Sequence, residues 1–288
     1  MHITNTRRSQ IYGLIFFAPA GIMVFLGFLF PLIRIITLAL RPDSIWSISN
    51  ISDVFTDETL AICVKNTLIF VIVSTIVHIL LGLLFASILN IELNPKFVKI
   101  ARSVMIIPWA ISPVVVATIF RLLYHPELSA FSNIFKAIPA FTQGILSNDK
   151  YALLAVIVIN IWYATPFYFL LFLARMQSIP KEIYEAATID GASYFTTLKS
   201  ITFPILKPLA ITLAVYDIVA AFNTFDLIWL TTMGGPGTST EVLATYIYRT
   251  AFRDLNFSYA SAMGIVLLVM IIVVCGLLWL PGRNKARC

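Results

Sequence analysis

Long apolar segments alternate with short polar connections along most of this chain. Each segment has about 20 residues, the length that an α-helix needs to cross the hydrocarbon core of a bilayer. Six segments meet this requirement: Ile11 to Ile33, Thr67 to Leu89, Ser103 to Phe120, Tyr151 to Ala174, Leu209 to Leu230 and Tyr259 to Leu280. The pattern predicts an all-α, polytopic membrane protein with six transmembrane helices in a single domain of residues 1–288.

The composition agrees with a membrane protein and argues against other classes. Of the 288 residues, 59% are hydrophobic and 12% are charged, far from the balance of soluble domains. The net charge of +6 does not indicate nucleic-acid binding, because the basic residues lie scattered at the ends of apolar segments. Neither a disulfide framework nor a metal site is predicted, because the cysteines and histidines are few and far apart: Cys63, Cys275, Cys288, His2, His78 and His125.

The basic residues also predict the orientation of the chain. Arg7 and Arg8 precede an apolar run that could be taken for a secretory signal, but the run continues to Ile33 and is too long, which favours an uncleaved first span. With a cytosolic N-terminus, twelve of the 20 basic residues and four acids lie in inner segments, against eight of each in outer ones. Both termini are therefore expected in the cytosol.

A polar hairpin of residues 178–207 separates the fourth span from the fifth on the cytosolic side. Ser178 and Pro180 mark the start of a first helix, with Glu182 and Glu185 near its first turn, where the helix dipole favours carboxylates. Gly191 is expected to end this helix in the left-handed conformation. From physics alone, such a hairpin could equally lie passively on the lipid headgroups.

A second short helix of the hairpin is expected to follow the glycine corner. Starting near Ala192, it would place Phe195, Leu198 and Ile201 on one apolar face. Pro204 and Pro208 are expected to end it before the fifth span.

The hairpin resembles the EAA loop of bacterial ABC importer permeases. The matching positions are Glu185, Ala186, Ala187, Asp190, Gly191, Ala192, Ile201, Pro204 and Pro208. This resemblance implies the type I ABC importer permease fold, with the first hairpin helix docked in a groove of a cytosolic ATPase. It also implies a set of ATPase-coupling residues: Glu185, Ala186, Ala187, Asp190 and Gly191.

The resemblance extends along the chain and is closest to the carbohydrate-uptake, maltose-type branch. It is carried by PWAISPVVVATIF, NIWYATPFYF and GGPGTSTEVLATYIYRTAFRD. It implies a second homologous permease subunit, two cytosolic ATPase subunits, an extracytoplasmic sugar-binding protein and a bacterial or archaeal cytoplasmic membrane. The chain lacks a GxxxxGK[ST] loop, so ATP and Mg²⁺ are expected on the partner subunits, and this chain is expected to be neither an enzyme nor a holder of cofactors.

Polar and small residues form a stripe within the fourth and fifth spans. An acid such as Asp217 is costly in hydrocarbon unless it is paired, hydrated or faces a cavity. The resemblance places a sugar site on this stripe: Tyr163, Ala164, Phe167, Asp217, Ala220, Ala221 and Thr224. Asp217 replaces a neutral residue of the maltose-type pattern, so a sugar or polyol with many donors is expected, and a glycerol-phosphate or other polyol-like solute is the alternative. Ordinary hydrogen bonding between helices is the other interpretation of the stripe.

Other polar features allow different interpretations. Pro108 and Pro113 predict a bend in the third span, either a gate or a packing kink. His78 is expected to be an interior histidine with its hydrogen bonds satisfied, and the glycines around Pro236 a tight outer turn. A stand-alone secondary transporter would not need the hairpin. An intramembrane aspartyl enzyme is disfavoured, because Asp217 and Asp226 would lie on opposite sides of a straight helix.

Overall fold

The computed structural model describes residues 3–41, 45–91, 95–130, 132–133, 137–138 and 144–283. Within these ranges the chain is helical and contains no strand. The chain divides into two compact units, one of residues 1–57 and 247–266 and the other of residues 58–246 and 267–288.

The smaller unit holds the N-terminal helices. These are α1 (Ile3–Val24), a π-helical turn (Phe25–Leu29), α2 (Phe30–Ala39) and α3 (Ser49–Thr56). The helix is unbroken from Ile3 to Ala39 and is therefore longer than the predicted span of residues 11–33. Between Ile15 and Ile36 its apolar side chains are exposed within this chain, and a lipid or protein environment would have to cover them.

Two helices contribute to both units, α13 (Leu243–Phe252) and α14 (Phe257–Arg283). Within the smaller unit, hydrogen bonds join the start of α14 to the N-terminal helices. The Ser258 hydroxyl donates to the carbonyl oxygen of Leu38 at 2.6 Å, and the Asn50 amide donates to Ser258 Oγ at 2.8 Å. The Tyr259 hydroxyl donates to the carboxylate of Asp57 at 2.9 Å.

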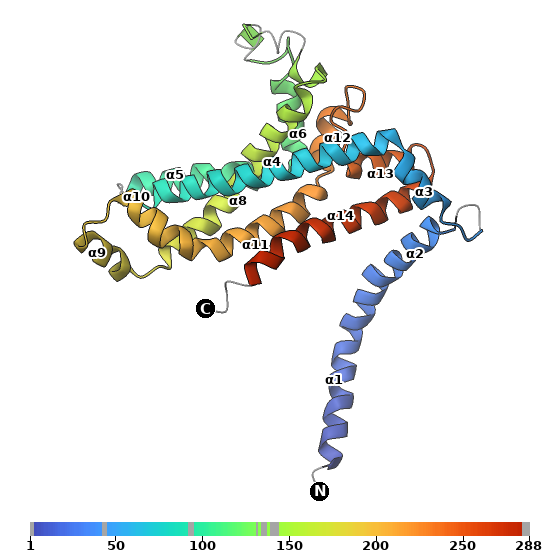
Figure 1. The fold of residues 1–288 in the computed structure, drawn as a ribbon, viewed down its shortest axis with the longest axis horizontal. Coiled ribbons are helices and arrows are strands. Elements are labelled where there is room, and N and C mark those ends of the chain that lie inside the picture. The colour runs from blue at the N-terminus through green and yellow to red at the C-terminus, as the bar shows by residue number, and fades with distance from the viewer. Residues whose placement is uncertain are drawn as a thin grey trace. The chain divides into compact units, whose positions relative to one another are not determined.

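The larger unit holds the remaining helices. They are α4 (Glu58–Leu89), α5 (Pro95–Ala110), α6 (Pro113–Leu123), a 3₁₀ turn (Ile145–Ser147), α8 (Ala152–Gln177), α9 (Lys181–Ile189), α10 (Tyr194–Thr197), a π-helical turn (Leu198–Thr202), α11 (Phe203–Phe222) and α12 (Asp226–Thr232). In Figure 1, α4, α8 and α11 run side by side; α4 packs extensively on α8 and also packs on α11. Their buried side chains form the main apolar clusters of the unit.

The contact between α4 and α8 depends on a glycine. A Cβ atom added to Gly82 would lie 2.7 Å from Cβ of Tyr168 and 3.1 Å from the backbone nitrogen of Phe169. Small residues allow the backbones of membrane helices to approach closely, where dispersion contacts are strongest. Gly82 therefore sets the spacing between the two central helices of the larger unit.

The third predicted span, residues 103–120, is not one straight helix. It is divided between α5 and α6, which meet at an angle of 94°. Ser112 takes an extended conformation (φ −60°, ψ 138°) because the ring of Pro113 clashes with a helical residue before it. The bend predicted from the prolines is confirmed. In the described residues, five helices are long and apolar enough to cross a membrane, or six if this bent pair counts as one.

The fifth predicted span also differs from the expectation. Pro204 and Pro208 do not end the second hairpin helix, because residues 194–222 form one helical run that could itself span a membrane. The π-helical turn just before Pro204 widens the backbone where the proline ring would otherwise meet a carbonyl of the preceding turn. The run ends at Phe222, and Asp226 starts the separate helix α12 instead of continuing the span.

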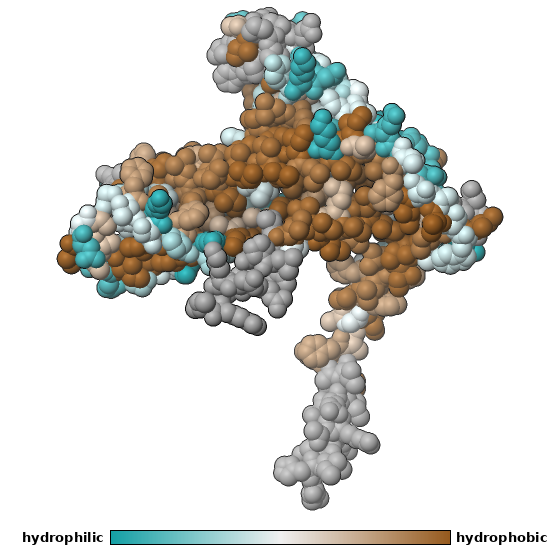
Figure 2. All heavy atoms as spheres, in the orientation of Figure 1, coloured by the Kyte–Doolittle hydropathy of each residue, from teal (hydrophilic) through white to brown (hydrophobic). Residues whose placement is uncertain are grey.

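The surface follows the same division into apolar helices and polar ends. Figure 2 shows apolar residues over the long helices of the larger unit and hydrophilic residues gathered on the α9–α10 hairpin. At the other end of α4, the amide of Asn66 donates to the carbonyl oxygens of Thr238, Ser239 and Glu241 at 3.0, 3.2 and 3.0 Å. These bonds anchor a turn in which Gly234 has a φ of +87°, so the tight turn expected around Pro236 is confirmed.

Candidate functional site

The hairpin between α8 and α11 is built as a corner with fixed geometry. Helix α9 ends in a Schellman motif, in which the N–H of Ala192 donates to the carbonyl of Ala187 and the N–H of Gly191 donates to that of Thr188. Gly191 has a φ of +75°, a conformation that other residues adopt only with strain. The predicted glycine corner is confirmed. Ser178 does not start α9, because it ends α8 and its hydroxyl donates to the carbonyl of Arg175.

Two tyrosines join the hairpin to the membrane helices. The Tyr194 hydroxyl donates to the carbonyl oxygen of Ser87 at the end of α4, at 3.0 Å. The hydroxyls of Tyr184 and Thr202 are 3.3 Å apart and link α9 to the turn that precedes α11. A force applied to α9 would thus be transmitted to α4 and α11 through defined contacts. The sequence analysis did not single out either hydroxyl for this role.

The residues that the sequence analysis assigned to ATPase coupling lie on the accessible part of this corner. Glu185, Ala186, Asp190 and Gly191 are exposed, whereas Ala187 is buried. A hollow of about 480 Å³ lies against α9, and its lining includes Ala186, Ala187 and Asp190. Ile189 on the same helix is 86% exposed, so α9 offers an apolar contact beside its carboxylates.

The residues predicted to contact substrate are divided between the interior and the surface of the larger unit. Tyr163, Ala164, Phe167 and Thr224 are half-buried and Ala220 is exposed. Asp217 and Ala221 are buried. Ala221 packs in an apolar cluster with Phe70 and Phe222, so it does not share the surface with the others.

An aromatic surface surrounds Phe167. Its ring lies 5.6 Å from that of Trp109 on α5 and 5.3 Å from that of Tyr216 on α11, measured between centroids. Trp109 is 44% exposed and Tyr216 is 54% exposed. We refer to Trp109, Phe167 and Tyr216 as the aromatic surface. The sequence analysis did not assign Trp109 or Tyr216 to the site, because three different helices bring these residues together.

Asp217 belongs to a buried polar cluster with His78 and Tyr168. Nδ1 of His78 lies 3.1 Å from Oδ1 and 3.0 Å from Oδ2 of Asp217, and the Tyr168 hydroxyl donates to Oδ1. The imidazole also stacks on the Tyr168 ring, at 5.0 Å between centroids and 7° between planes. His78 is 1% exposed and Asp217 is 3% exposed. The carboxylate of Asp217 is therefore paired inside the helix bundle.

The other ring nitrogen of His78 also faces an acceptor. Nε2 lies 3.3 Å from the carbonyl oxygen of Asn160 on α8. Both ring nitrogens of His78 therefore face oxygen acceptors, a carboxylate on one side and a carbonyl on the other. The expectation that His78 is an interior histidine with satisfied hydrogen bonds is confirmed.

Comparison with known proteins identifies the family. The family model described as "Binding-protein-dependent transport system inner membrane component" matches residues 78–280. The chain belongs to this family. The matched range includes the hairpin, the aromatic surface and the buried polar cluster. The expected family of ABC importer permeases is thereby confirmed.

Individual proteins of this kind resemble nearly the whole chain. A probable ABC transporter permease from Bacillus subtilis, YurN, is 30% identical over 91% of this chain and 93% of its own length. The trehalose/maltose transport system permease MalF of Thermococcus litoralis is 36% identical over 72% of this chain and 69% of its own. A bacterial ABC transporter involved in alginate import has a chain with a TM-score of 0.87, 24% identity and coverage of 98% of both chains. The expected permease fold is confirmed.

Among the residues that the structure describes, no three His, Cys, Asp or Glu side chains come together in a way that could hold a metal ion. The polar groups that it does assemble, His78 with Asp217 and Tyr168, hydrogen-bond one another.

Proposed function

We propose that this chain is one of two permease subunits of an ATP-driven importer that moves a sugar or oligosaccharide into the cytosol. The importer would also contain two cytosolic ATPase subunits and receive its cargo from an extracytoplasmic binding protein. The family description, which names binding-protein-dependent transport, supports this arrangement. The sugar cargo is supported by the names of two similar proteins, which refer to trehalose and maltose and to the polysaccharide alginate.

The aromatic surface is the observation that carries the assignment of the cargo. A sugar ring has a flat C–H face that packs on aromatic rings, and a rim of hydroxyls that needs hydrogen-bond partners. Trp109 and Tyr216 offer exposed rings, and each contacts the half-buried ring of Phe167. Tyr163, four residues before Phe167 on α8, and Thr224, just past the end of α11, carry hydroxyl groups on partly exposed side chains.

The remaining predicted positions fit around this surface. Ala164 and Ala220 have small side chains that leave room for a bulky cargo. Asp217 and Ala221 belong to the predicted site as well, and Asp217 is held by His78 and Tyr168 behind the aromatic surface. We propose that Asp217 acts on the cargo through the position of its neighbours on α8 and α11.

The hairpin would couple transport to ATP hydrolysis on a partner. Closing of the ATPase pair would move α9, and the bonds of Tyr184 and Tyr194 would pass that movement to α11 and α4. To invert a two-state population from 1:99 to 99:1, ATP must favour one state by about 5.5 kcal/mol. The proposed orientation has both termini and the hairpin in the cytosol, in the cytoplasmic membrane of a bacterium or archaeon.

Two tryptophans provide a matched test of the cargo site. Trp109 and Trp162 are both 44% exposed, but only Trp109 belongs to the aromatic surface. In vesicles containing the complete transporter, Trp109→Ala should reduce ATP-dependent uptake of a labelled disaccharide at low concentration by about tenfold, because an aromatic contact of about 1.5 kcal/mol changes a binding constant by that factor. Trp162→Ala should leave uptake nearly unchanged. Equal losses in the two variants would refute the assignment of the surface to cargo.

Copurification tests the proposed ATPase partner. Glu185 and Glu182 are exposed acids three residues apart on α9, and the resemblance assigns only Glu185 to coupling. Glu185→Ala should lose an ATPase subunit that remains bound to the Glu182→Ala variant. Uptake that continues without ATP, or without any bound ATPase, would instead identify a stand-alone secondary transporter.

A further inference from the structure

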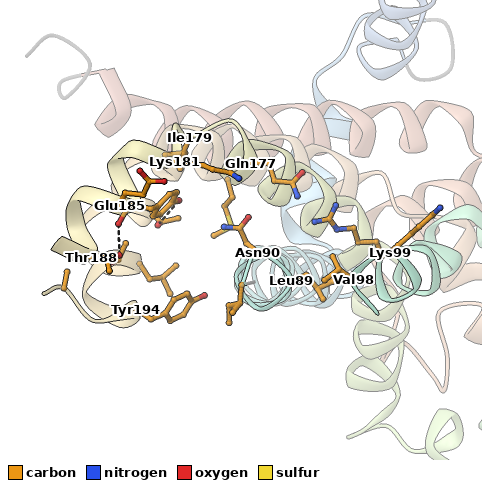
Figure 3. A pocket seen from close by; sticks show the side chains of 18 of the residues that line it. Leu89, Asn90, Val98, Lys99, Gln177, Ile179, Lys181, Glu185, Thr188 and Tyr194 are labelled. Atoms are coloured by element: carbon orange, nitrogen blue, oxygen red, sulfur yellow. Dashed lines mark hydrogen bonds between the residues drawn. The ribbon is translucent and has the colours of Figure 1, made fainter. Parts of the chain in front are cut away.

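A groove separates the hairpin from the ends of three long helices in the larger unit. Its volume is about 1080 Å³, and its lining comes from α4, α5, α8, α9 and the segment of residues 192–202. Figure 3 shows Glu185, Thr188 and Tyr194 on one side of the opening and Leu89 and Val98 on the other. We call this space the interfacial groove.

The ends of the candidate spans show at what depth in the membrane the groove lies. The candidate spans Glu58–Leu89 and Ala152–Gln177 end at Leu89 and Gln177, and both of these residues line the groove. The points where apolar helices reach their polar connections mark the level of the lipid headgroups. The groove therefore opens at headgroup level.

Positive charge dominates the lining. Lys99, Arg102 and Lys181 contribute three basic groups, against one carboxylate, that of Glu185. Among the residues that the structure describes, no carboxylate oxygen lies within 4.0 Å of these three basic groups. The groove thus carries cationic groups that are not neutralised by the described side chains.

Arg102 is held in place and still has a donor to offer. With the Gln177 amide assigned so that its oxygen faces the guanidinium, Nη2 of Arg102 donates to that oxygen at 2.6 Å, which orients the guanidinium without cancelling its charge. Its Nε is buried and has no hydrogen-bond partner. A buried donor without a partner costs free energy, and an anionic oxygen is the strongest acceptor it could receive.

Apolar side chains lie beside the basic groups. Ile106 follows Arg102 by one turn on α5, and Leu198 and Ile91 line the same space. A soluble anion makes no use of such side chains, whereas a phospholipid has acyl chains that begin directly below its phosphate. The combination of cations, open hydroxyls such as that of Thr197, and apolar contacts at headgroup level fits an amphiphilic anion.

We propose that the interfacial groove binds the headgroup of an anionic glycerophospholipid, with Arg102 and Lys181 contacting its phosphate and Lys99 at the rim. A zwitterionic headgroup presents the same phosphate together with a cation, which the unneutralised basic lining repels. The bound lipid would lie between α9 and the ends of α4 and α8. Its occupancy would therefore affect how firmly the hairpin is held against the membrane helices.

Native mass spectrometry of the full-length chain in a neutral detergent tests this proposal. The chain is titrated with phosphatidylglycerol and, separately, with phosphatidylcholine of the same acyl chains. We expect the chain to retain one molecule of phosphatidylglycerol in preference to phosphatidylcholine. The double variant Arg102→Gln/Lys181→Gln should weaken its retention by about 30-fold, from roughly fivefold for each basic residue near an anionic lipid.

A matched control variant removes one arginine and one lysine at positions outside the groove. Arg175 and Lys199 are exposed and do not line the groove, so Arg175→Gln/Lys199→Gln should retain phosphatidylglycerol nearly as the unchanged chain does. The single variant Lys181→Gln, at an exposed position, removes a cation without touching the packing of Arg102. Its retention should fall about fivefold.

Three results would overturn the proposal. If both double variants weaken the retention of phosphatidylglycerol equally, the lipid is attracted diffusely to the basic surface and does not bind at a site. Equal retention of phosphatidylcholine and phosphatidylglycerol would remove the selectivity for an anion. Displacement of the bound lipid by millimolar inorganic phosphate would assign the groove to a soluble phosphate compound.

Discussion

The buried polar cluster yields the sharpest prediction, because its two ionisable members depend on each other. His78 is 1% exposed and Asp217 is 3% exposed, with two N···O distances of 3.0 and 3.1 Å between them. Removing one partner of a buried pair costs about 3–5 kcal/mol, because the other charge stays buried and uncompensated. His78→Leu also loses the stacking on Tyr168, worth about 0.5–1.5 kcal/mol.

The double variant isolates the interaction between His78 and Asp217 from the contacts that each residue makes with other residues. In His78→Leu/Asp217→Leu no unpaired charge remains, and replacing a buried pair by apolar residues is often neutral or even stabilising by about 1–4 kcal/mol. Each single variant should therefore be destabilised by about 3 kcal/mol or more, and the double variant by less than either single variant. A coupling energy of about 3 kcal/mol or more follows from this cycle.

Unfolding of the purified full-length chain in mixed micelles, followed by circular dichroism during a denaturing-detergent titration, measures these free energies. Asp217→Asn serves as a control, because it keeps the volume of the side chain and removes its negative charge. If the effects of the two single substitutions add to within about 0.5 kcal/mol, the distances do not reflect an energetic pair and the reasoning is refuted.

The same variants test how Asp217 contributes to transport. Asp217→Leu should abolish uptake if Asp217 belongs to the cargo site. Asp217 could instead act by holding α4, α8 and α11 in position. In that case, adding His78→Leu to the Asp217→Leu variant should restore its stability and, with it, part of the uptake. A double variant that is stable and yet inactive would show that the carboxylate itself is needed by the cargo.

Three further predictions concern single residues. Gly82→Ala should destabilise the chain by about 1–3 kcal/mol because its Cβ would overlap α8, whereas Gly264→Ala, with no atom within 4 Å of the added Cβ, should be neutral or slightly stabilising in the same titration. Gly191→Val should lose ATP-dependent uptake and Gly191→Asn should retain most of it, since Asn tolerates the left-handed conformation; equal activity of the two would contradict a conformational role. Asn66→Leu should cost about 1–3 kcal/mol, because three carbonyls of the turn around Pro236 lose their donor, and an unchanged unfolding midpoint would exclude that anchor.

The local chemistry of single segments was predictable from the sequence. Apolar runs of spanning length gave the helices, since each satisfies its backbone hydrogen bonds internally and depends little on distant residues. Gly191 predicted its own left-handed corner, and Pro108 with Pro113 predicted the bend, because these residues restrict the backbone wherever they occur. The loop from Glu185 to Gly191 carried the family resemblance that the comparisons confirm.

Segment ends were less predictable, since neighbouring turns can absorb a local restriction. Pro204 and Pro208 would interrupt a regular α-helix, but the π-helical turn before them lets the helix continue from Tyr194 to Phe222. Conversely, the helix ends at Phe222 and not in the predicted region near Leu230. Nothing in the hydropathy of this stretch marks the break.

What the sequence determined by itself was therefore the membrane class, the hairpin and the family. What the tertiary structure alone decided was which residues meet. His78, Tyr168 and Asp217 come from three helices and are separated by tens of residues, and so are Trp109, Phe167 and Tyr216. The periodicity of one helix gives the face on which a residue lies, but the facing partner depends on how closely the backbones pack, which here rests on contacts such as that of Gly82 with Tyr168. For that reason Asp217 could be recognised as unusual from the sequence, while its pairing with His78 could be seen only in the fold.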